Sequence, residues 1–293
     1  MSTEAVKAPR APAAPKFPKP PTAAKRTGIR KTGRRVMVYG EGGVGKTTLA
    51  LKAATLGETV FLDLEGTLYA LLGENAPDTI VPCYPETWDE ILAHLDGIRA
   101  NCDAGNAPKT VVIDSLTAAE TLLDVYVLAH YTPNKGGFGR VDFNPAGNAT
   151  PLASLNELGG GGDSAAKYPA FNVMLARLDS LASRGVNVVV VCHEAPTDVT
   201  DLVNGGQVFR RAEPRLMTTA NGKNSMRLRA VEWCDDVLHM YAERVASADK
   251  AEHRTGDILV AFSPDNGYVA KSRSLTGDPK TREDFDLTAI LTK

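Results

Sequence analysis

The chain has 293 residues, of which 43% are hydrophobic and 23% charged, and its formal net charge is −2. This composition is ordinary for a soluble globular protein with a hydrophobic core. The sequence contains no run of about 18 uncharged apolar residues and does not begin with an apolar segment, so we expect neither a transmembrane helix nor a secretory signal.

The cysteines favour a reducing compartment. No two of them have the C-x-x-C spacing, and all lie in apolar surroundings: Cys83, Cys102, Cys192 and Cys234. This pattern is typical of reduced, mostly buried thiols and does not favour a structural zinc site. We therefore expect a cytoplasmic protein with no membrane attachment.

The first residues differ in composition from the rest of the chain. Residues 1–35 contain ten lysines or arginines, one acidic residue and six prolines, while the remainder carries 23 basic and 34 acidic residues. Such a segment cannot bury enough apolar surface to offset the entropy lost on ordering. We predict a disordered basic tail over residues 1–33, either a spacer or an arm that contacts phosphates.

After this tail, short apolar runs alternate with longer helical patterns. Predicted strands lie at 34–39, 59–64, 110–114, 187–192 and 236–241. Predicted helices lie at 47–56, 87–100, 115 to about 131 and 168–184, and another ends at 231–233. Thr87 with Glu90, and Thr117 with Glu120, have the spacing of a capping box at the start of a helix. The strands are apolar throughout, as in a parallel sheet that is covered on both faces.

The end of the chain predicts an antiparallel edge. Residues 258–262 and 268–272 flank Asp265-Asn266-Gly267, a strong hairpin signal. The sequence thus predicts an α/β domain over residues 34–275, with a mostly parallel sheet flanked by helices and a C-terminal antiparallel hairpin. Residues 276–293 would form a short tail or helix. Two long stretches, 132–167 and 195–224, do not fit the alternation, and such long loops are usually functional or disordered.

A glycine-rich segment after the first strand indicates a nucleotide site. It matches G-x-x-x-x-G-K-[ST] and opens a helix, so its backbone N–H groups can converge on a phosphate. Lys46 would reach the β- and γ-phosphates of ATP, and the hydroxyl of Thr47 would bind Mg²⁺. The predicted nucleotide-binding residues are Gly40, Glu41, Gly42, Gly43, Val44, Gly45, Lys46, Thr47 and Thr48.

Three further side chains follow predicted strands at the same sheet edge. Asp114 would hold Mg²⁺ with Thr47, or else cap the following helix. Glu65 is the candidate general base for the attacking water; Asp63 competes for this role, and Glu65 could instead be a solvated carboxylate. His193 would sense the γ-phosphate, or be a structural histidine.

These four motifs, in this order, resemble those of the RecA-like ATPases. Residues 61–65 resemble the strand that bears the catalytic glutamate, 111–115 the metal-binding strand, and 188–193 the sensor strand, with histidine in place of glutamine. Within this superfamily, the chain looks most like phage AAA-type ATPases that act as single-strand annealing and recombination proteins. The resemblance spans about residues 34–274. It implies that single-stranded DNA is a partner and that the protein, if a phage encodes it, acts in the cytoplasm of the host cell.

The resemblance also implies DNA-binding loops and a homo-oligomer. The two unusual stretches would contact DNA through cations and aromatic rings, although surface loops without this role have a similar composition. Their candidate residues are Lys135, Phe138, Arg140, Phe209, Arg210, Arg211, Arg215 and Lys223. Lys271 and Arg273, on one face of a predicted strand, would reach the nucleotide of a neighbouring subunit in a ring or filament, or would simply be an exposed basic strand end. Alternative functions are a nucleotide-gated assembly protein with little turnover and a ring ATPase of the DnaB or KaiC kind.

Overall fold

A computed structural model describes residues 31–136, 139–201, 206–219, 222–246 and 252–293. Within these ranges one large sheet has the strand order β11-β10-β9-β1-β7-β4-β2-β3, with β8 paired to β7. Its strands are β1 (Arg35–Gly40), β2 (Thr59–Asp63), β3 (Ile80–Cys83), β4 (Thr110–Asp114), β7 (Asn187–Asp201), β8 (Gln207–Pro214), β9 (Asp236–Ala246), β10 (Glu252–Ala261) and β11 (Lys280–Thr281). A separate pair consists of β5 (Tyr131–Pro133) and β6 (Val141–Phe143).

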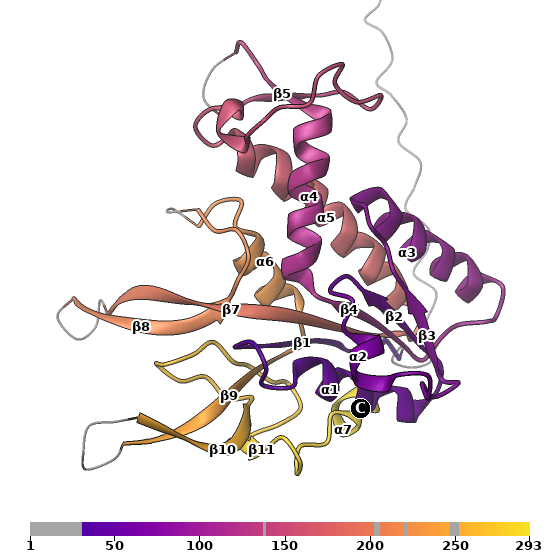
Figure 1. The fold of residues 1–293 in the computed structure, drawn as a ribbon, viewed down its shortest axis with the longest axis vertical. Coiled ribbons are helices and arrows are strands. Elements are labelled where there is room, and N and C mark those ends of the chain that lie inside the picture. Colours follow the sequence, from indigo (N-terminus) through magenta and orange to yellow (C-terminus); the bar gives the residue numbers. More distant parts are fainter. Residues whose placement is uncertain (1–30, 137–138, 202–205, 220–221, 247–251) are drawn as a thin grey trace, which may run out of the picture. The chain divides into compact units, whose positions relative to one another are not determined.

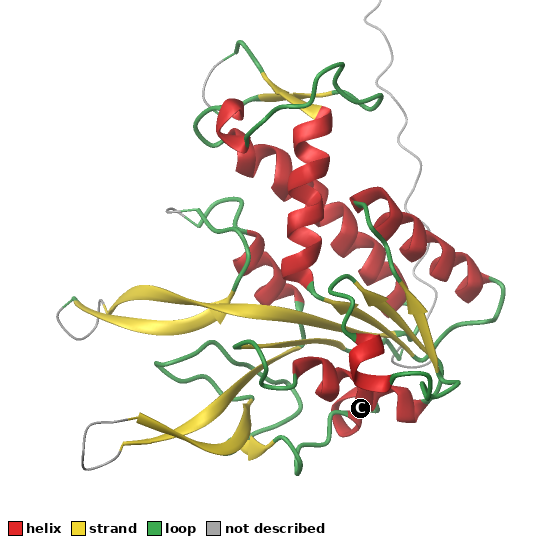
Figure 2. Cartoon of the chain, in the orientation of Figure 1, coloured by secondary structure: helices red, strands yellow, loops and turns green. Residues whose placement is uncertain are grey.

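Helices cover both faces of the large sheet (Figure 1; Figure 2). They are α1 (Lys46–Leu51), α2 (Leu68–Leu72), α3 (Trp88–Asp103), α4 (Leu116–His130), α5 (Gly162–Ala182), α6 (Met226–Trp233) and α7 (Thr288–Leu291), with 3₁₀ turns η1 (Lys52–Leu56) and η2 (Leu155–Leu158). From β3 to β9 the paired strands run parallel, and β9, β10 and β11 are antiparallel. The predicted α/β class, with a mostly parallel sheet flanked by helices and antiparallel strands from the C-terminal part, is confirmed.

Alternating residues of the parallel strands fill two hydrophobic cores. Val188 and Val190 of β7 pack under α3, α4, α5 and α6, while Val189 and Val191 face α1, η1 and the C-terminal segment. All four are at most 1% exposed, and burying a valine side chain stabilises the fold by about 1.5–3 kcal/mol. The apolar runs of the sequence are therefore strands covered on both faces.

The order of strands brings distant parts of the chain to one edge. β7 lies between β1 and β4, and β4 pairs with β2. Because these four strands are parallel, their carboxyl ends meet at the same edge of the sheet. The glycine-rich segment 40–47, which we call the P-loop, and the polar residues that follow the other three strands therefore come together there.

Two helix starts differ from prediction. α5 begins at Gly162 rather than at residue 168. It continues through Pro169, although proline usually stands at the start of a helix and not inside it. α4 is capped by Ser115, whose Oγ accepts the N–H of Ala118 at 3.2 Å. Thr117 is therefore not the cap: it lies in the first turn, and its hydroxyl donates to the Arg215 carbonyl at 3.3 Å.

The predicted C-terminal hairpin is wrong in its pairing. The turn is present, since the N–H of Gly267 donates to Asp265 Oδ1 at 2.7 Å. However, β10 pairs with the long strand β9, whereas the segment after the turn forms only isolated bridges, one of them between Lys271 and Val237. The eleven-residue edge of β9 offers β10 a longer ladder than the five residues 268–272 could provide.

The second unusual stretch is largely a β-ribbon, not a loop. β7 continues past Cys192, and residues 194–201 pair with 207–214 in an antiparallel ladder, which we call the ribbon. Figure 1 shows it extending away from the helices. The first stretch holds β5, β6 and η2 beyond the end of α4.

Candidate active site

The P-loop curls around a pocket of about 410 Å³ at the carboxyl edge of the sheet. Gly43 and Gly45 have φ of 80° and 85°, a left-handed conformation that glycine adopts without strain. Six of the nine predicted loop residues line the pocket: Gly42, Gly43, Gly45, Lys46, Thr47 and Thr48. The remaining three do not line it: Gly40 ends β1, Glu41 lines a separate hollow, and Val44 is buried in the core at 1% exposure.

Lys46 is positioned by the loop itself. Its Nζ donates to the carbonyl oxygens of Gly40 at 3.0 Å and Glu41 at 2.8 Å, and the residue is only 7% exposed. Burial lowers the pKa of Lys46, and the neighbouring carboxylates of Glu65 and Asp114 only partly offset this. The ammonium is thus held at the loop, where the oxygens of a phosphate would be stronger acceptors than carbonyls.

Thr47 and Asp114 form a direct pair across the pocket. The Thr47 hydroxyl donates to Asp114 Oδ2 at 2.5 Å, and Asp114 is 1% exposed. Burial raises the pKa of Asp114 to about 6, against the opposing effect of the Thr47 hydrogen bond. A hydroxyl and a carboxylate beside a phosphate loop are hard oxygen donors of the kind that Mg²⁺ prefers, so this pair fits the predicted metal position.

Glu65 is held by two side chains. Its Oε1 accepts a short hydrogen bond from the Ser115 hydroxyl and lies 2.9 Å from His193 Nε2. Burial raises the pKa of Glu65, but the hydrogen bonds from Ser115 and His193 outweigh burial and leave it below its usual value. Glu65 is therefore an ionised carboxylate at neutral pH, able to orient a water and accept a proton.

Asp63, the competing candidate, has a structural role. Its two oxygens accept the N–H groups of Thr67 at 3.0 Å and Leu68 at 2.9 Å, at the start of α2, and the residue is 3% exposed. It does not line the pocket, whereas Glu65 does. Of the two carboxylates, Glu65 is therefore the one that faces the pocket.

Sequence reasoning missed two contributors. Ser115 ends the segment 111–115 that resembles a metal-binding strand, and its hydroxyl both caps α4 and donates to Glu65. Arg282 lines the pocket beside Gly45 and forms an ion pair with Glu283 at 2.7 Å. No local motif marks Arg282, because it reaches the P-loop only through the pairing of β11 with β10.

Lys271 and Arg273 lie at the other end of the sheet. Arg273 Nη1 pairs with Asp235 Oδ1 at 2.9 Å, and Lys271 Nζ donates to the Glu232 carbonyl at 3.3 Å. Asp235 precedes β9, whereas the P-loop follows the carboxyl end of β1, a strand of six residues or about 20 Å. Neither Lys271 nor Arg273 is part of a regular strand, so the prediction that they share one face of a strand is wrong.

The predicted DNA-binding residues fall into two separate groups. Lys135 and Arg140 are exposed in the segment between β5 and β6. Figure 1 shows β5 at the end of α4, a helix of 15 residues or about 22 Å that begins after Ser115. Phe138 lies outside the described residues. Arg215 and Lys223 are exposed on the segment that follows the ribbon, and the N–H of Arg215 donates to the His193 carbonyl at 2.8 Å.

The ribbon carries the other three. Phe209 is half-buried, and the side chain of Arg210 is 79% exposed and 3.4 Å from Asp198. Arg211 forms a short ion pair with the buried Glu213, which also binds Arg227 of α6. Of these cations, Arg210 is the one available to a polyanion, since Arg211 is committed to the base of the ribbon.

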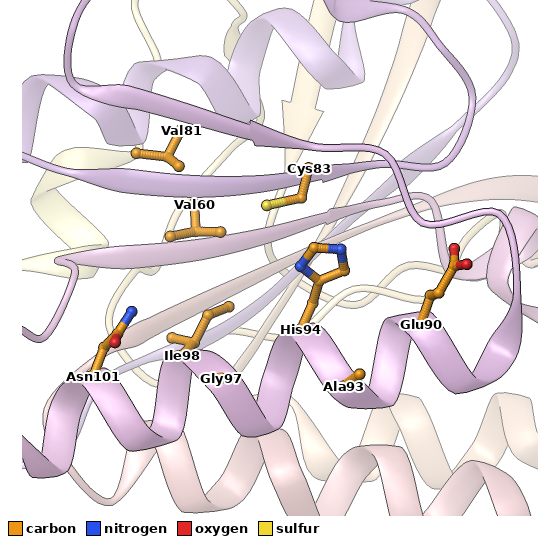
Figure 3. A pocket seen from close by; sticks show the side chains of 9 residues that line it. All are labelled: Val60, Val81, Cys83, Glu90, Ala93, His94, Gly97, Ile98 and Asn101. Carbon is orange, nitrogen blue, oxygen red and sulfur yellow. The ribbon is translucent and has the colours of Figure 1, made fainter.

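A second hollow lies away from this site. It has a volume of about 390 Å³ and is enclosed by α3 on one side and β2 and β3 on the other (Figure 3). Its lining includes Val60 and Cys83 from the strands and His94 and Ile98 from the helix, and it shares no lining residue with the phosphate pocket. It is a groove beside the edge strand, not part of the active site.

One protein family matches most of the chain. The family described as "AAA domain" matches residues 32–274. No curated protein sequence matches the chain. Among solved structures, one similar protein is a KaiC-like protein of the hyperthermophilic archaeon Pyrococcus horikoshii, with 16% identity, a TM-score of 0.42 and coverage of 85% of this chain and 84% of that one. Within the described residues, no helix is long and apolar enough to cross a membrane.

Proposed function

The chain belongs to the AAA domain family, and on that premise we propose that it binds ATP with Mg²⁺ in the P-loop pocket and hydrolyses it. The observation that carries this proposal is the position of Glu65. Its carboxylate lies in the same pocket as Lys46, Thr47 and Asp114, fixed by Ser115 and His193. A nucleotide-binding loop alone would account for binding, whereas an oriented carboxylate across the pocket supports hydrolysis.

Each side chain has a role in this reaction. Lys46 would exchange its carbonyl partners for β- and γ-phosphate oxygens, and Thr47 and Asp114 would hold Mg²⁺. When bound, Mg²⁺ supplies positive charge to the phosphate oxygens. Glu65 would accept a proton from the water that attacks the γ-phosphorus, as the bond to the ADP oxygen breaks. Because His193 contacts Glu65 directly, a γ-phosphate that attracted Nε2 would change the position of Glu65 and report its own presence.

Phosphate release from ATP tests this function. The wild-type protein should release phosphate only with Mg²⁺, and Lys46→Ala should abolish release without unfolding the chain, because Lys46 faces the loop and not the core. Normal hydrolysis by a folded Lys46→Ala variant would refute the assignment. Binding without release, with and without single-stranded DNA, would instead support a nucleotide-gated assembly protein.

We further propose that hydrolysis depends on single-stranded DNA, in annealing or recombination. The supporting feature is the ribbon, since its first strand is the continuation of β7 beyond His193. It presents Arg210 for a phosphate and exposes 65% of Val208 on the same face, while the partly exposed Phe209 on the opposite face could contact a base. Nucleotide state at His193 and DNA at the ribbon would thus act on one strand.

Arg210→Ala provides a direct test of the ribbon. The affinity for a fluorescent single-stranded oligonucleotide should fall several-fold, and the salt slope should drop by about one released counterion. The matched control is Arg184→Ala, since Arg184 also forms a surface ion pair with an aspartate, Asp103, at 2.7 Å. Equal effects of the two variants would exclude the ribbon as the DNA contact.

We also propose a homo-oligomer, ring or filament, with a site completed by a neighbour. Arg273 and Lys271 lie at the amino end of the strands and the P-loop at the carboxyl end, so a subunit cannot apply this pair to its own nucleotide. Only a head-to-tail neighbour could bring them there, as an arginine finger acting in trans.

A further inference from the structure

Arg282 is fixed beside the P-loop by its own backbone. It follows β11, which pairs with β10, and its N–H donates to the Ile258 carbonyl at 2.7 Å. On the other side, Lys52 Nζ donates to the carbonyl oxygens of Arg282 and Phe285, each at 3.0 Å. Lys52 comes immediately after α1, so the helix that begins in the P-loop holds the segment that carries Arg282.

Hydrophobic packing anchors the same segment. Phe285, Leu287 and Ile290 are at most 1% exposed and share one core cluster with Leu49 and Ala50 of α1. Figure 1 shows the C-terminal segment running beside α1. Residues 276–293 are thus part of the domain, and the position of Arg282 is set by the fold and not by a mobile tail.

The guanidinium faces the nucleotide pocket. Arg282 lines it together with Gly45, Lys46 and Thr48, and a Cβ added at Gly45 would overlap Arg282 Nη1. Its partner in the structure is Glu283, whose side chain is 63% exposed, while that of Arg282 is 31% exposed. An ion pair this accessible to water is weak, so a phosphate carrying more charge can displace Glu283.

We propose that Arg282 is a second nucleotide-binding cation, supplied by the same chain, which donates to phosphate oxygens of a nucleotide held in the P-loop. This inference rests on the proposed function, because it requires a nucleotide in that loop. Arginine suits the position, since its planar guanidinium can present two parallel donors to a phosphate while its backbone stays fixed. Glu283 competes with the phosphate for those donors and therefore limits affinity.

Nucleotide affinity of single variants tests the assignment. Equilibrium titration with a fluorescent ATP analogue should show binding weakened roughly 10-fold or more by Arg282→Ala, the usual effect of losing a charged hydrogen bond. Arg282→Lys should recover part of the loss, and Glu283→Gln should tighten binding because it removes the competing carboxylate. The matched control is Lys280→Ala, an exposed cation of β11 that does not line the pocket and should bind as wild type.

The outcomes separate this inference from the proposed function. If the wild type does not bind, or Lys46→Ala binds equally well, the nucleotide site itself is wrong. If Lys46→Ala is defective but Arg282→Ala binds like Lys280→Ala, only the role of Arg282 is refuted. A loss seen with ATP but not with a GTP analogue would indicate a base contact and overturn the phosphate assignment. Should Arg282→Ala fail to fold, unchanged affinity in Glu283→Gln decides against the proposal.

Discussion

Replacing Asp114 by asparagine should stabilise the ligand-free protein while removing its response to Mg²⁺. Burial raises the pKa of Asp114 from 3.8 to about 6, so the native state holds a proton that the unfolded chain releases. The free energy of unfolding therefore falls as the pH rises from below the lower value to above the higher one. At about 1.4 kcal/mol per pH unit, the unfavourable contribution above pH 6 is ~3 kcal/mol.

The asparagine amide removes this unfavourable contribution to the free energy of unfolding but keeps an acceptor for the Thr47 hydroxyl. Urea unfolding with EDTA at about pH 8 should show Asp114→Asn to be more stable than wild type by ~1–3 kcal/mol, and the gap should shrink by ~1–2 kcal/mol at about pH 5. The control is Asp103→Asn. Asp103 is exposed, and its hydrogen bond from Arg184 lowers its pKa, so its replacement should give no gain.

Ligand addition completes the experiment. Mg-ATP should raise the unfolding midpoint of the wild type, because it binds only the native state, and should have a much smaller effect on Asp114→Asn. The reasoning would be refuted if Asp114→Asn were less stable than wild type at about pH 8, or if the gap did not change with pH.

Three further predictions concern turnover and assembly. Glu65→Gln should leave ATP binding nearly intact and reduce phosphate release by ~10²-fold or more, whereas Asp63→Asn should mainly lower stability; the opposite pattern would exchange the two roles. Deletion of residues 1–25 should keep the fold, and if the tail is a phosphate-binding arm, the salt dependence of DNA binding should flatten; an unchanged slope would make the tail a spacer. Arg273→Ala should lower turnover without loss of ATP binding, and mixing it with Lys46→Ala should restore some activity. Absence of rescue in demonstrably mixed assemblies would exclude the trans role.

The sheet and the phosphate edge could be predicted because their signals are local. The valine run of β7 indicates a buried strand within a few residues. The acid at the end of β4 likewise marks the end of a strand that can bind a ligand. Parallel strands bring such ends together whatever lies between them. Lys46, Thr47, Glu65, Asp114 and His193 were therefore placed in one pocket by reasoning along the chain.

The features that escaped prediction depend on non-local pairing. Most residues of the ribbon are partly or fully exposed, so it has no alternation of apolar and polar residues that would mark it as a strand. The turn at Gly267 was visible, but the segment before it pairs with β9, and the segment after it forms only isolated bridges. Arg282 reaches the P-loop because β11 pairs with β10, a choice that no short segment specifies.

The length of β7 has a mechanical consequence. Asp201 lies eight positions after His193, so the strand reaches about 26 Å beyond the edge of the pocket. A stiff strand acts as a lever: a tilt of about 5° at His193 would displace its tip by ~2 Å. Arg227 binds Thr197 at 2.7 Å, so α6 would turn with it. A sub-ångström event at one phosphate would thereby become a movement large enough to alter contact with a polymer outside the domain.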